Sequence, residues 1–481
     1  MKTIHYLIAA GLFSLSTTST ALAQKAPAPY GAIPTTHQLE WQNMEYYMFI
    51  HFGPNTFTDK EWGHGDEDPK VFNPKKLDAR QWARTAKAAG MKAIIITAKH
   101  HDGFCLFPSK YSTHTVRESN WKDGKGDVLK ELSAACKEYG LKFGVYLSPW
   151  DRNHPKYGTA EYNEIFAKTL KEVHTQYGPI FEQWFDGAKG EGEKKQDYDF
   201  KLFNSVVYEH NPQAIIFSDI GPGARWMGNE NGVAGETNWS TLNTDGFGVG
   251  ADAPKATVLN TGNEDGKYWI PAEVDVSIRP GWFYSASTDD KVKTLEQLVS
   301  IYHTSVGRNG NLLLNVPVDR DGLIHPNDST RLMELRRYLD ASFKTNLAKG
   351  KKVIASTEAG KKYGAQNLTD GNANTYWTTG GMVKNATITI DLGKPTQLNR
   401  IVLQEYISLG QRISSFMVMY WDGKAYKLLD QQTTIGHKRI LAFPTITSSK
   451  IRIIITEPNA DPVLSEIGVY LAPPLPKPTA P

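Results

Sequence analysis

A regular alternation of apolar runs and amphipathic helical patterns extends from Glu45 to about Asn346 and restricts this chain to a few fold types. Short runs rich in β-branched and aromatic residues are typical of buried strands, and between them apolar residues recur with the spacing of a helix face. The strand candidates are YYMFIHF, MKAIIITAK, LKFGVYLS, PIFEQWFD, QAIIFSD, EVDVSI and NGNLLLNV. Strands that alternate with helices in this way form parallel sheets, so the pattern predicts an α/β fold.

Two α/β architectures fit such an alternation, a doubly wound sheet and a closed barrel. No GxGxxG or GxxxxGK[ST] loop follows any strand candidate, which disfavours a nucleotide-binding doubly wound sheet. We therefore predict a (β/α) barrel of the TIM type, with an irregular Gly- and Asn-rich stretch over residues 221–268.

The pattern changes after residue 350. Residues 351–470 show little helical periodicity and many short alternating runs, including ATITIDL, NRIVLQEY, SFMVMYW and KIRIIITE. Short alternating strands separated by turns predict an all-β antiparallel sandwich, jelly-roll-like in type. Residues 471–481 are Pro-rich, and we expect them to form a flexible tail.

The N-terminus resembles a targeting segment. Residues 1–23 contain one lysine, an apolar stretch, a Ser/Thr-rich run and an Ala-Leu-Ala end, which is typical of a secretory signal peptide cleaved before Gln24. The sequence therefore predicts an exported protein, periplasmic or secreted, whose barrel domain covers residues 24–346.

Charge and cysteine content exclude several classes of protein. The formal net charge of +3 is small for 481 residues. Nucleic-acid-binding proteins carry a concentrated basic face, so we expect no nucleic-acid partner. Beyond the signal segment no apolar stretch is long enough to cross a bilayer, so we expect no membrane span. Cys105 and Cys136 fall in a loop and a helix, which favours two free buried thiols over a disulfide.

Polar and aromatic residues recur where the predicted strands end. In a TIM-type barrel the carboxyl ends of the strands share one face, which holds the active site. The residues at these positions are His51, His100, His101, Asp102, Tyr146, Trp150, Asp151, Asp186 and Asp219. A single one of them is typical of a cap or a turn, but the whole set on one rim indicates a binding site.

Three chemistries could use this rim. Metal hydrolysis is disfavoured because His100 and His101, adjacent on an extended segment, should point in opposite directions, and because no HxH or HExxH spacing occurs. A serine or cysteine nucleophile is disfavoured because no GxSxG elbow is present and nothing near Cys105 favours a thiolate. Glycoside hydrolysis needs two carboxyl groups. The indole rings that could face a sugar are those of Trp62, Trp150, Trp184 and Trp282.

The motifs FIHFG, EWG, KHHDGF, WFDGA, RWMGNE and RPGWFY occur in this order within residues 38–346. This ordered set resembles glycoside hydrolase family 29, the retaining α-L-fucosidases, and is most similar to the branch acting on α-1,3/1,4-linked fucose. The resemblance implies a (β/α) barrel, in agreement with the strand and helix pattern, and it implies no cofactor for catalysis.

The same resemblance implies roles for individual residues. The nucleophile of the family lies in the motif matched by WFDG, hence Asp186, and the acid/base is implied at Glu230 of GNE, with Glu236 as the alternative. Glu182, deeper in the strand of Asp186, is expected to support the site through buried polar partners. Arg225 would orient a carboxylate or a hydroxyl. The implied substrate pocket consists of His51, Glu61, Trp62, His100, His101, Tyr146, Trp184, Arg225, Glu236 and Trp282.

In the C-terminal domain, NLTDGNANTYWTT followed by ITIDLG resembles the discoidin or coagulation-factor type C fold, which includes carbohydrate-binding modules of family 32. That resemblance implies a structural calcium held by oxygen donors, for which the candidates are Asp370, Asn372, Thr375 and Glu466. Asp-Gly and Asn are also common turn residues, so the loop could hold its shape without metal.

We therefore interpret the whole chain as a retaining exo-α-L-fucosidase. It is expected to remove terminal α-1,3/1,4-linked L-fucose from branched, Lewis-type glycans by double displacement. Its expected partners are therefore fucosylated oligosaccharides or glycoconjugates. A broad-specificity α-L-fucosidase of the same family and a non-catalytic fucose-binding protein are the alternatives.

Overall fold

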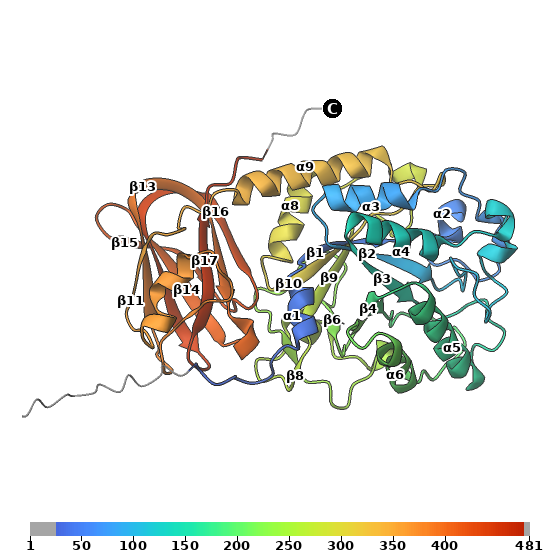
Figure 1. Cartoon of the computed structure of the whole chain (residues 1–481), viewed down its shortest axis with the longest axis horizontal. Helices are drawn as coiled ribbons and strands as arrows, with labels where there is room; N and C mark the ends of the chain where they lie inside the picture. The colour runs from blue at the N-terminus through green and yellow to red at the C-terminus, as the bar shows by residue number, and fades with distance from the viewer. Residues whose placement is uncertain (1–25, 476–481) are drawn as a thin grey trace, which may run out of the picture.

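Two domains lie side by side along the long axis of the molecule, a barrel and a β-sandwich (Figure 1). The computed structural model describes residues 26–475. The signal peptide predicted over residues 1–23 lies outside the described residues, as does the end of the Pro-rich tail, residues 476–481.

The first domain is a closed parallel barrel, which confirms the predicted fold class. Its strands follow the order β1-β10-β9-β6-β5-β4-β3-β2, and every neighbouring pair is parallel. The strands are β1 (Tyr46–Ile50), β2 (Ala93–Lys99), β3 (Lys142–Leu147), β4 (Ile180–Trp184), β5 (Ile215–Ser218), β6 (Ala224–Trp226), β9 (Ala272–Ser277) and β10 (Gly310–Asn315). They are buried almost throughout, which explains their continuous apolar character in the sequence.

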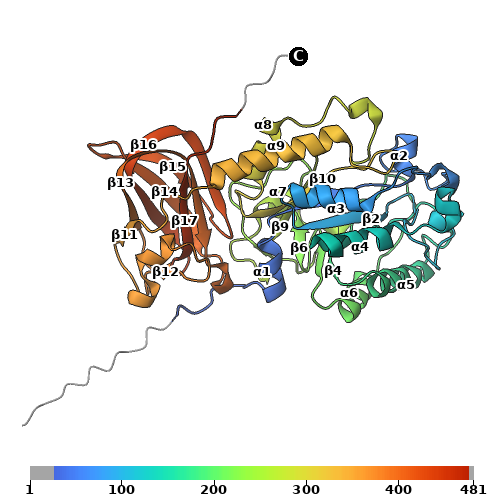
Figure 2. The ribbon, with the colours of Figure 1, turned by 45° about the horizontal axis from the view of Figure 1, so that its top comes forward.

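Helices surround this barrel (Figure 2). The longer ones are α3 (Ala79–Ala88), α4 (Val128–Tyr139), α5 (Glu161–Gln176), α6 (Phe200–His210), α8 (Leu295–Thr304) and α9 (Pro326–Phe343), and the shorter ones are α1 (Thr36–Gln42), α2 (Pro54–Thr58) and α7 (Ala256–Thr261). Helix α4 illustrates how the sequence sets their limits. The side chain of Asp127 accepts a hydrogen bond from the N–H of Lys130, and Gly140 ends the helix with a φ of 65°, a conformation that favours glycine.

One barrel strand was not predicted. Strand β6 lies inside the stretch that the sequence marked as irregular, and it completes the barrel between β5 and β9. It spans only Ala224–Trp226, and a short turn rather than a helix connects it to β5. Three residues are too few to show a periodicity, so only the pairing with its neighbours identifies this strand.

The second domain is an antiparallel β-structure, again as predicted. Its strands are β11 (Lys352–Ala355), β12 (Trp377–Thr378), β13 (Ala386–Glu405), β14 (Ile413–Trp421), β15 (Tyr426–Gln432), β16 (Arg439–Pro458) and β17 (Val463–Tyr470). The runs ATITIDL and NRIVLQEY, which look like two strands, belong to the single strand β13. The register of β13 with β16 shifts between Asp391 and Thr396, so the strand continues through an exposed bend instead of ending there.

The sandwich is hydrogen-bonded to a barrel segment that follows β6. Thr434 accepts a hydrogen bond from the N–H of Asn238 at 2.9 Å, and the side chain of Gln411 donates to the carbonyl of Asn238 at 3.0 Å and accepts from the N–H of Ser240 at 2.8 Å. These groups are buried. The second domain therefore holds part of the long β6–β9 connection in place.

Cys105 and Cys136 are separate buried thiols, as predicted. Within residues 26–475, none of the helices has both the length and the apolar character needed to cross a bilayer.

Candidate active site

A cavity of about 270 Å³ opens at the carboxyl ends of the barrel strands. It brings together most of the residues singled out from the sequence, namely His51, Glu61, Trp62, His100, His101, Tyr146, Trp184, Asp186, Glu230 and Trp282. Pockets for drug-sized ligands usually measure roughly 300–1,000 Å³. A cavity just below that range suits a single sugar ring.

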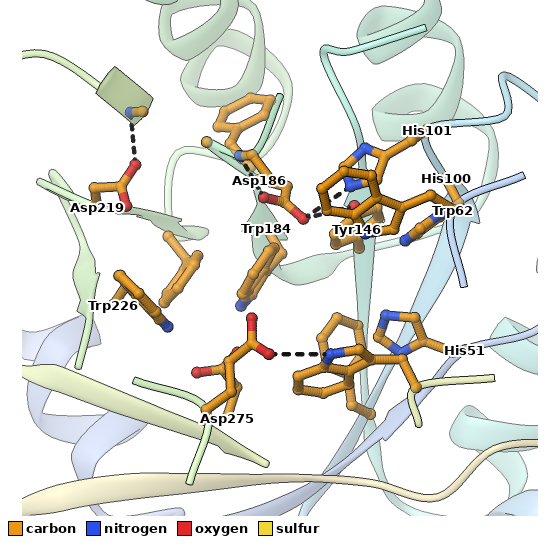
Figure 3. A pocket seen from close by; sticks show the side chains of 18 of the residues that line it. His51, Trp62, His100, His101, Tyr146, Trp184, Asp186, Asp219, Trp226 and Asp275 are labelled. Carbon is orange, nitrogen blue, oxygen red and sulfur yellow. Dashed lines mark hydrogen bonds and ion pairs between the residues drawn. The ribbon is translucent and has the colours of Figure 1, made fainter. Parts of the chain in front are cut away.

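Asp186 follows β4, and its carboxyl group is bound by neighbouring side chains and by the backbone (Figure 3). Its Oδ1 accepts a hydrogen bond from the N–H of Ala188 at 2.7 Å, and its Oδ2 accepts one from the hydroxyl of Tyr146 at 2.9 Å and lies 3.4 Å from Nε2 of His101. Burial alone would raise the pKa of Asp186, but these hydrogen bonds and the imidazole of His101 hold it below its ordinary value. The group can therefore act as a nucleophile at acidic to neutral pH.

Glu230 lies in the same cavity, four residues after β6, with the opposite electrostatic environment. Its Oε2 accepts a hydrogen bond from the indole N–H of Trp282 at 3.2 Å. Burial, followed by the carboxylates of Asp186 and Glu61, raises the pKa of Glu230. Two carboxyl groups of one pocket thus have pKa values moved apart, which is the arrangement expected for a carboxylate and an acid that work together.

Two histidines of the cavity are neutral. Burial lowers the pKa of His51 to about 3, and it lowers the pKa of His100 well below its ordinary value, helped by neighbouring His101 and His51. Nδ1 of His51 lies 2.9 Å from the amide oxygen of Asn315 and therefore carries the proton, since that oxygen can only accept. This leaves Nε2 of His51 as an acceptor for a sugar hydroxyl.

The prediction that His100 and His101 point in opposite directions is wrong. Both rings line the cavity, with their centroids 4.2 Å apart. Strand β2 ends at Lys99, and the chain turns at His101, so the alternation of an extended strand no longer applies.

Aromatic rings form one wall of the cavity. Trp184 stacks on Phe217, with centroids 4.1 Å apart, and on Tyr146 at 5.2 Å, while Trp62 at the mouth is 45% exposed. Trp150, expected to face a sugar, is fully buried and does not line the cavity; it packs behind Trp62 and His101.

Arg225 and Glu236 lie outside the cavity, so the structure does not place them where the sequence resemblance implied. Arg225 is fully buried and donates to the carbonyls of Leu259 and Ile270 and to the side chain of Asn238, which ties β6 to the following connection. The side chain of Glu236 is 74% exposed and 3.6 Å from Arg308. In the RWMGNENGVAGE stretch Trp226 and Glu230 line the cavity, so Glu230 is the only carboxyl group of that stretch in the site.

Two strand-end acids also lie behind the cavity rather than in it. Asp151 forms a buried ion pair with Lys99 at 2.9 Å, and Asp102 accepts a hydrogen bond from the N–H of Phe104 in the turn after β2. Their positions match the turn and pairing roles that are common for aspartate at strand ends.

The cavity also contains Asp219, which the sequence placed on the rim but not in the sugar pocket, and two residues that the sequence analysis did not single out, Trp226 and Asp275. Asp219 accepts a hydrogen bond from the N–H of Gly250 at 2.7 Å, and Trp226 and Asp275 complete the side opposite His51 (Figure 3). Asp275 lies two residues from both Glu273 and Ser277 along β9, so the three side chains point to the same face of the strand. That alternation of acids in EVDVS was a usable signal, since strand residues two apart share one face.

The predicted calcium ligands are grouped around one loop of the sandwich. Oδ2 of Asp370 accepts a hydrogen bond from the hydroxyl of Thr375 at 2.7 Å, and Oδ1 accepts one from the N–H of Asn372 at 2.8 Å. Oε2 of Glu466, on β17, is buried and has no hydrogen-bond partner among the described residues. Burial and the carboxylate of Asp370 raise the pKa of Glu466 to about 7. Two carboxyl groups with an unsatisfied buried oxygen fit a hard cation.

A larger groove, of about 990 Å³, lies at the other end of the barrel. It is lined where β3, β4 and β5 begin, and its residues include Trp41, Phe143, Ile180 and Ile215. In TIM-type barrels that end serves stability rather than chemistry, so the smaller cavity is the candidate site.

Comparison with known proteins agrees with this site. The Alpha-L-fucosidase family profile matches residues 28–343, and the F5/8 type C domain profile matches residues 352–467. Alpha-L-fucosidase 1 of Arabidopsis thaliana is 41% identical over 460 residues, which cover 94% of this chain and 90% of the relative.

Solved structures show the same similarity over both domains. A putative alpha-L-fucosidase from Bacteroides thetaiotaomicron superposes with a TM-score of 0.89 at 41% identity, and the match covers 93% of this chain and 100% of that one. A family 29 fucosidase of Ruminococcus gnavus in complex with fucose superposes with a TM-score of 0.85 at 36% identity, with 93% and 97% covered.

Proposed function

Because the chain belongs to the α-L-fucosidases of glycoside hydrolase family 29, we propose that it hydrolyses fucosides by double displacement, with Asp186 as nucleophile and Glu230 as acid/base. The observation that carries this assignment is the pair of carboxyl groups in one sugar-sized cavity, with the pKa of Asp186 lowered and that of Glu230 raised. A retaining glycosidase needs one ionised and one protonated carboxyl group at the start of its cycle.

In the first step the Asp186 carboxylate attacks C1 of fucose while Glu230 donates its proton to the departing glycosidic oxygen. The N–H of Ala188 and the hydroxyl of Tyr146 hold the attacking carboxylate in one orientation. The C1–oxygen bond of the substrate breaks, and an ester between C1 and Asp186 forms with inversion.

In the second step Glu230, now ionised, removes a proton from water, and the hydroxide attacks C1. The ester bond breaks, Asp186 leaves as a carboxylate, and the second inversion restores the α configuration. The indole N–H of Trp282 is a hydrogen-bond donor to Glu230 in its charged form and so favours this intermediate state.

We further propose that the enzyme acts from the end of a glycan on α-1,3/1,4-linked fucose. The cavity volume supports a single terminal sugar, and the placement of Glu230 in the GNE motif supports the branch whose sequence the chain resembles. The exposed ring of Trp62 at the mouth offers an apolar face to the rest of a branched glycan.

Fucose release from three substrates tests both the proposed activity and the proposed linkage preference. We expect release chiefly from a Lewis-type α-1,3/1,4-fucosylated trisaccharide, and much less from α-1,2-fucosylated lactose and from an aryl α-L-fucoside, measured as initial rates by chromatography. Comparable rates on all three would favour a broad-specificity fucosidase. Binding of L-fucose without any release would favour the non-catalytic alternative.

A structural calcium in the sandwich is a separate proposal. The carboxylates of Asp370 and Glu466, with the side-chain oxygens of Asn372 and Thr375, would hold it, and the ion would supply countercharge to an acid pair rather than chemistry. The buried, unpartnered Oε2 of Glu466 supports this proposal.

We expect calcium to raise the melting temperature of the protein and EDTA to lower it. A ligand present at a hundred times its dissociation constant stabilises the folded state by about 2.7 kcal/mol. Differential scanning calorimetry measures the shift, and Glu466→Gln, which removes the charge at nearly constant volume, should abolish it. A melting temperature of the wild-type protein that does not respond to calcium would contradict the proposal.

A further inference from the structure

Two carboxyl groups lie inside the barrel, below the fucose cavity and outside its lining. Glu182 on β4 and Glu273 on β9 are both fully buried. Neither can contact a sugar, and the double displacement uses neither. An explanation is needed because ionised carboxylates are very costly to bury without compensating partners.

Three side-chain donors serve the four oxygens of this pair. Glu182 Oε2 accepts from the indole N–H of Trp41 at 2.8 Å, Glu273 Oε1 accepts from the indole N–H of Trp184 at 2.7 Å, and Glu273 Oε2 accepts from the hydroxyl of Tyr47. The fourth oxygen, Glu182 Oε1, is buried and has no donor among the described residues.

The two carboxyl groups are hydrogen-bond partners of each other, and a proton shared between them would supply the missing donor. If Glu182 Oε1 carries that proton, it donates to Glu273, and all four oxygens are then satisfied. Burial and the charge of Glu273 raise the pKa of Glu182 well above its ordinary value. Burial also raises the pKa of Glu273, but the hydrogen bonds from Glu182, Tyr47 and Trp184 oppose that rise, so Glu273 is the better place for the single negative charge.

Two side chains, Trp184 and Tyr146, link the Glu273 carboxylate to the catalytic carboxylate of Asp186. Trp184, whose N–H binds Glu273, stands in the middle of the cavity between Asp186 and Asp275 (Figure 3). Its ring is stacked between Phe217 and Tyr146, and the hydroxyl of Tyr146 donates to Asp186. A rotation of the indole would therefore move the ring that directs Tyr146 toward Asp186.

We propose that Glu182 and Glu273 share one proton, held on Glu182, and that the Glu273 carboxylate is a positioning residue that fixes Trp184 and, through Tyr146, the nucleophile. This inference rests on the proposed role of Asp186. It assigns a function to Glu182, the buried acid in the middle of β4, and identifies Glu273 as its partner.

A matched pair of isosteric variants tests the assignment. Glu182→Gln keeps a donor toward Glu273, so we expect it to retain kcat and fucose affinity to within a few-fold. Glu273→Gln replaces a carboxylate that accepts three hydrogen bonds by an amide with one oxygen acceptor and one NH2 donor. The indole N–H of Trp184 therefore loses its charged acceptor. Small misplacements of catalytic groups cost up to about 100-fold in rate, and we expect a loss of this order in kcat for Glu273→Gln.

Two further measurements separate positioning from general stability. In a Trp184→Phe background, where no indole N–H remains, Glu273→Gln should cause no additional loss of kcat. Glu182→Met, similar in size but without a donor, should lose activity that Glu182→Gln keeps, with melting temperatures followed for every variant.

Equal losses in Glu182→Gln and Glu273→Gln, the reverse order, or additive losses of Trp184→Phe and Glu273→Gln would overturn the proposal. If Glu273→Gln does not fold, Glu182→Gln alone decides, because its inactivity in a folded protein contradicts a proton held on Glu182. Calorimetric titration with L-fucose follows the pocket without turnover. The asymmetry between the two variants would persist in fucose affinity even if Asp186 were not the nucleophile, so the two proposals can fail independently.

Discussion

Substitution of Asp186 by asparagine is expected to reduce kcat by roughly 10⁴-fold or more, as removal of the nucleophile does in other covalent mechanisms. The amide keeps the size of the side chain and one acceptor for the N–H of Ala188 or the hydroxyl of Tyr146, so the fold should persist. The measurement is kcat on the Lewis-type α-1,3/1,4-fucosylated trisaccharide, with circular dichroism and L-fucose affinity as checks that the pocket remains. Near wild-type turnover in the folded variant would remove Asp186 from the nucleophilic role.

A smaller residue at the same position gives a positive control. Asp186→Gly leaves a space on the face of the sugar from which the carboxylate attacks, and azide can enter it. Because azide would replace the nucleophile in the first displacement only, the product should be the inverted β-fucosyl azide, identified by NMR. Formation of the α-fucosyl azide in this variant would place the nucleophile elsewhere.

Substitution of Glu230 by glutamine is expected to lower the rate by about 10² to 10⁴-fold on natural glycans, because general acid catalysis supplies that range. The loss should be much smaller for the first step with an activated aryl fucoside, since a good leaving group needs no protonation. Rates on the trisaccharide and on the aryl fucoside measure this difference. Equal losses on both substrates would argue against an acid role for Glu230.

Glu236→Gln is the matched control, because the side chain lies in the same connection, is 74% exposed and does not line the cavity. It should retain activity on both substrates. Glu230→Ala with azide should give the retained α-fucosyl azide, since there azide attacks the glycosyl-Asp186 ester in the second step. A Glu236→Gln variant with the leaving-group dependence expected of Glu230 would move the acid role to Glu236.

The pH dependence of kcat/KM tests the same roles of Asp186 and Glu230. Asp186 must be ionised, and its pKa is lowered, so activity should be lost only as the pH falls below the ordinary range of aspartate. Glu230 must be protonated, and its pKa is raised, so activity should be lost as the pH rises through a value above that of ordinary glutamate. The basic limb should therefore disappear from the profile of Glu230→Gln, while the acidic limb stays.

The structure also explains why some residues that the sequence placed in the sugar pocket lie outside it. Arg225 and Trp150 belong to motifs or strand ends that look functional, yet both are fully buried and bind other parts of the barrel. Residue type and position in a motif indicate which end of the barrel a residue lies near. The direction of its side chain depends on the geometry of the local turn, which is set by contacts with residues far apart in the chain. The paired rings of His100 and His101 show the same limit, because β2 ends at Lys99 and both histidines lie beyond the strand, where alternation no longer applies.

The sequence by itself determined the barrel and the β-domain, because strand and helix periodicities are local and each apolar face must be buried. It also located Asp186, since a strand followed by WFDG ends at the catalytic face of such a barrel. Only the tertiary structure decided that Glu230 rather than Glu236 faces the cavity and that three-residue β6 completes the barrel. It alone brought Glu182 beside Glu273, because contacts between strands β4 and β9, which are remote in sequence, depend on the closure and register of the barrel and not on any local pattern.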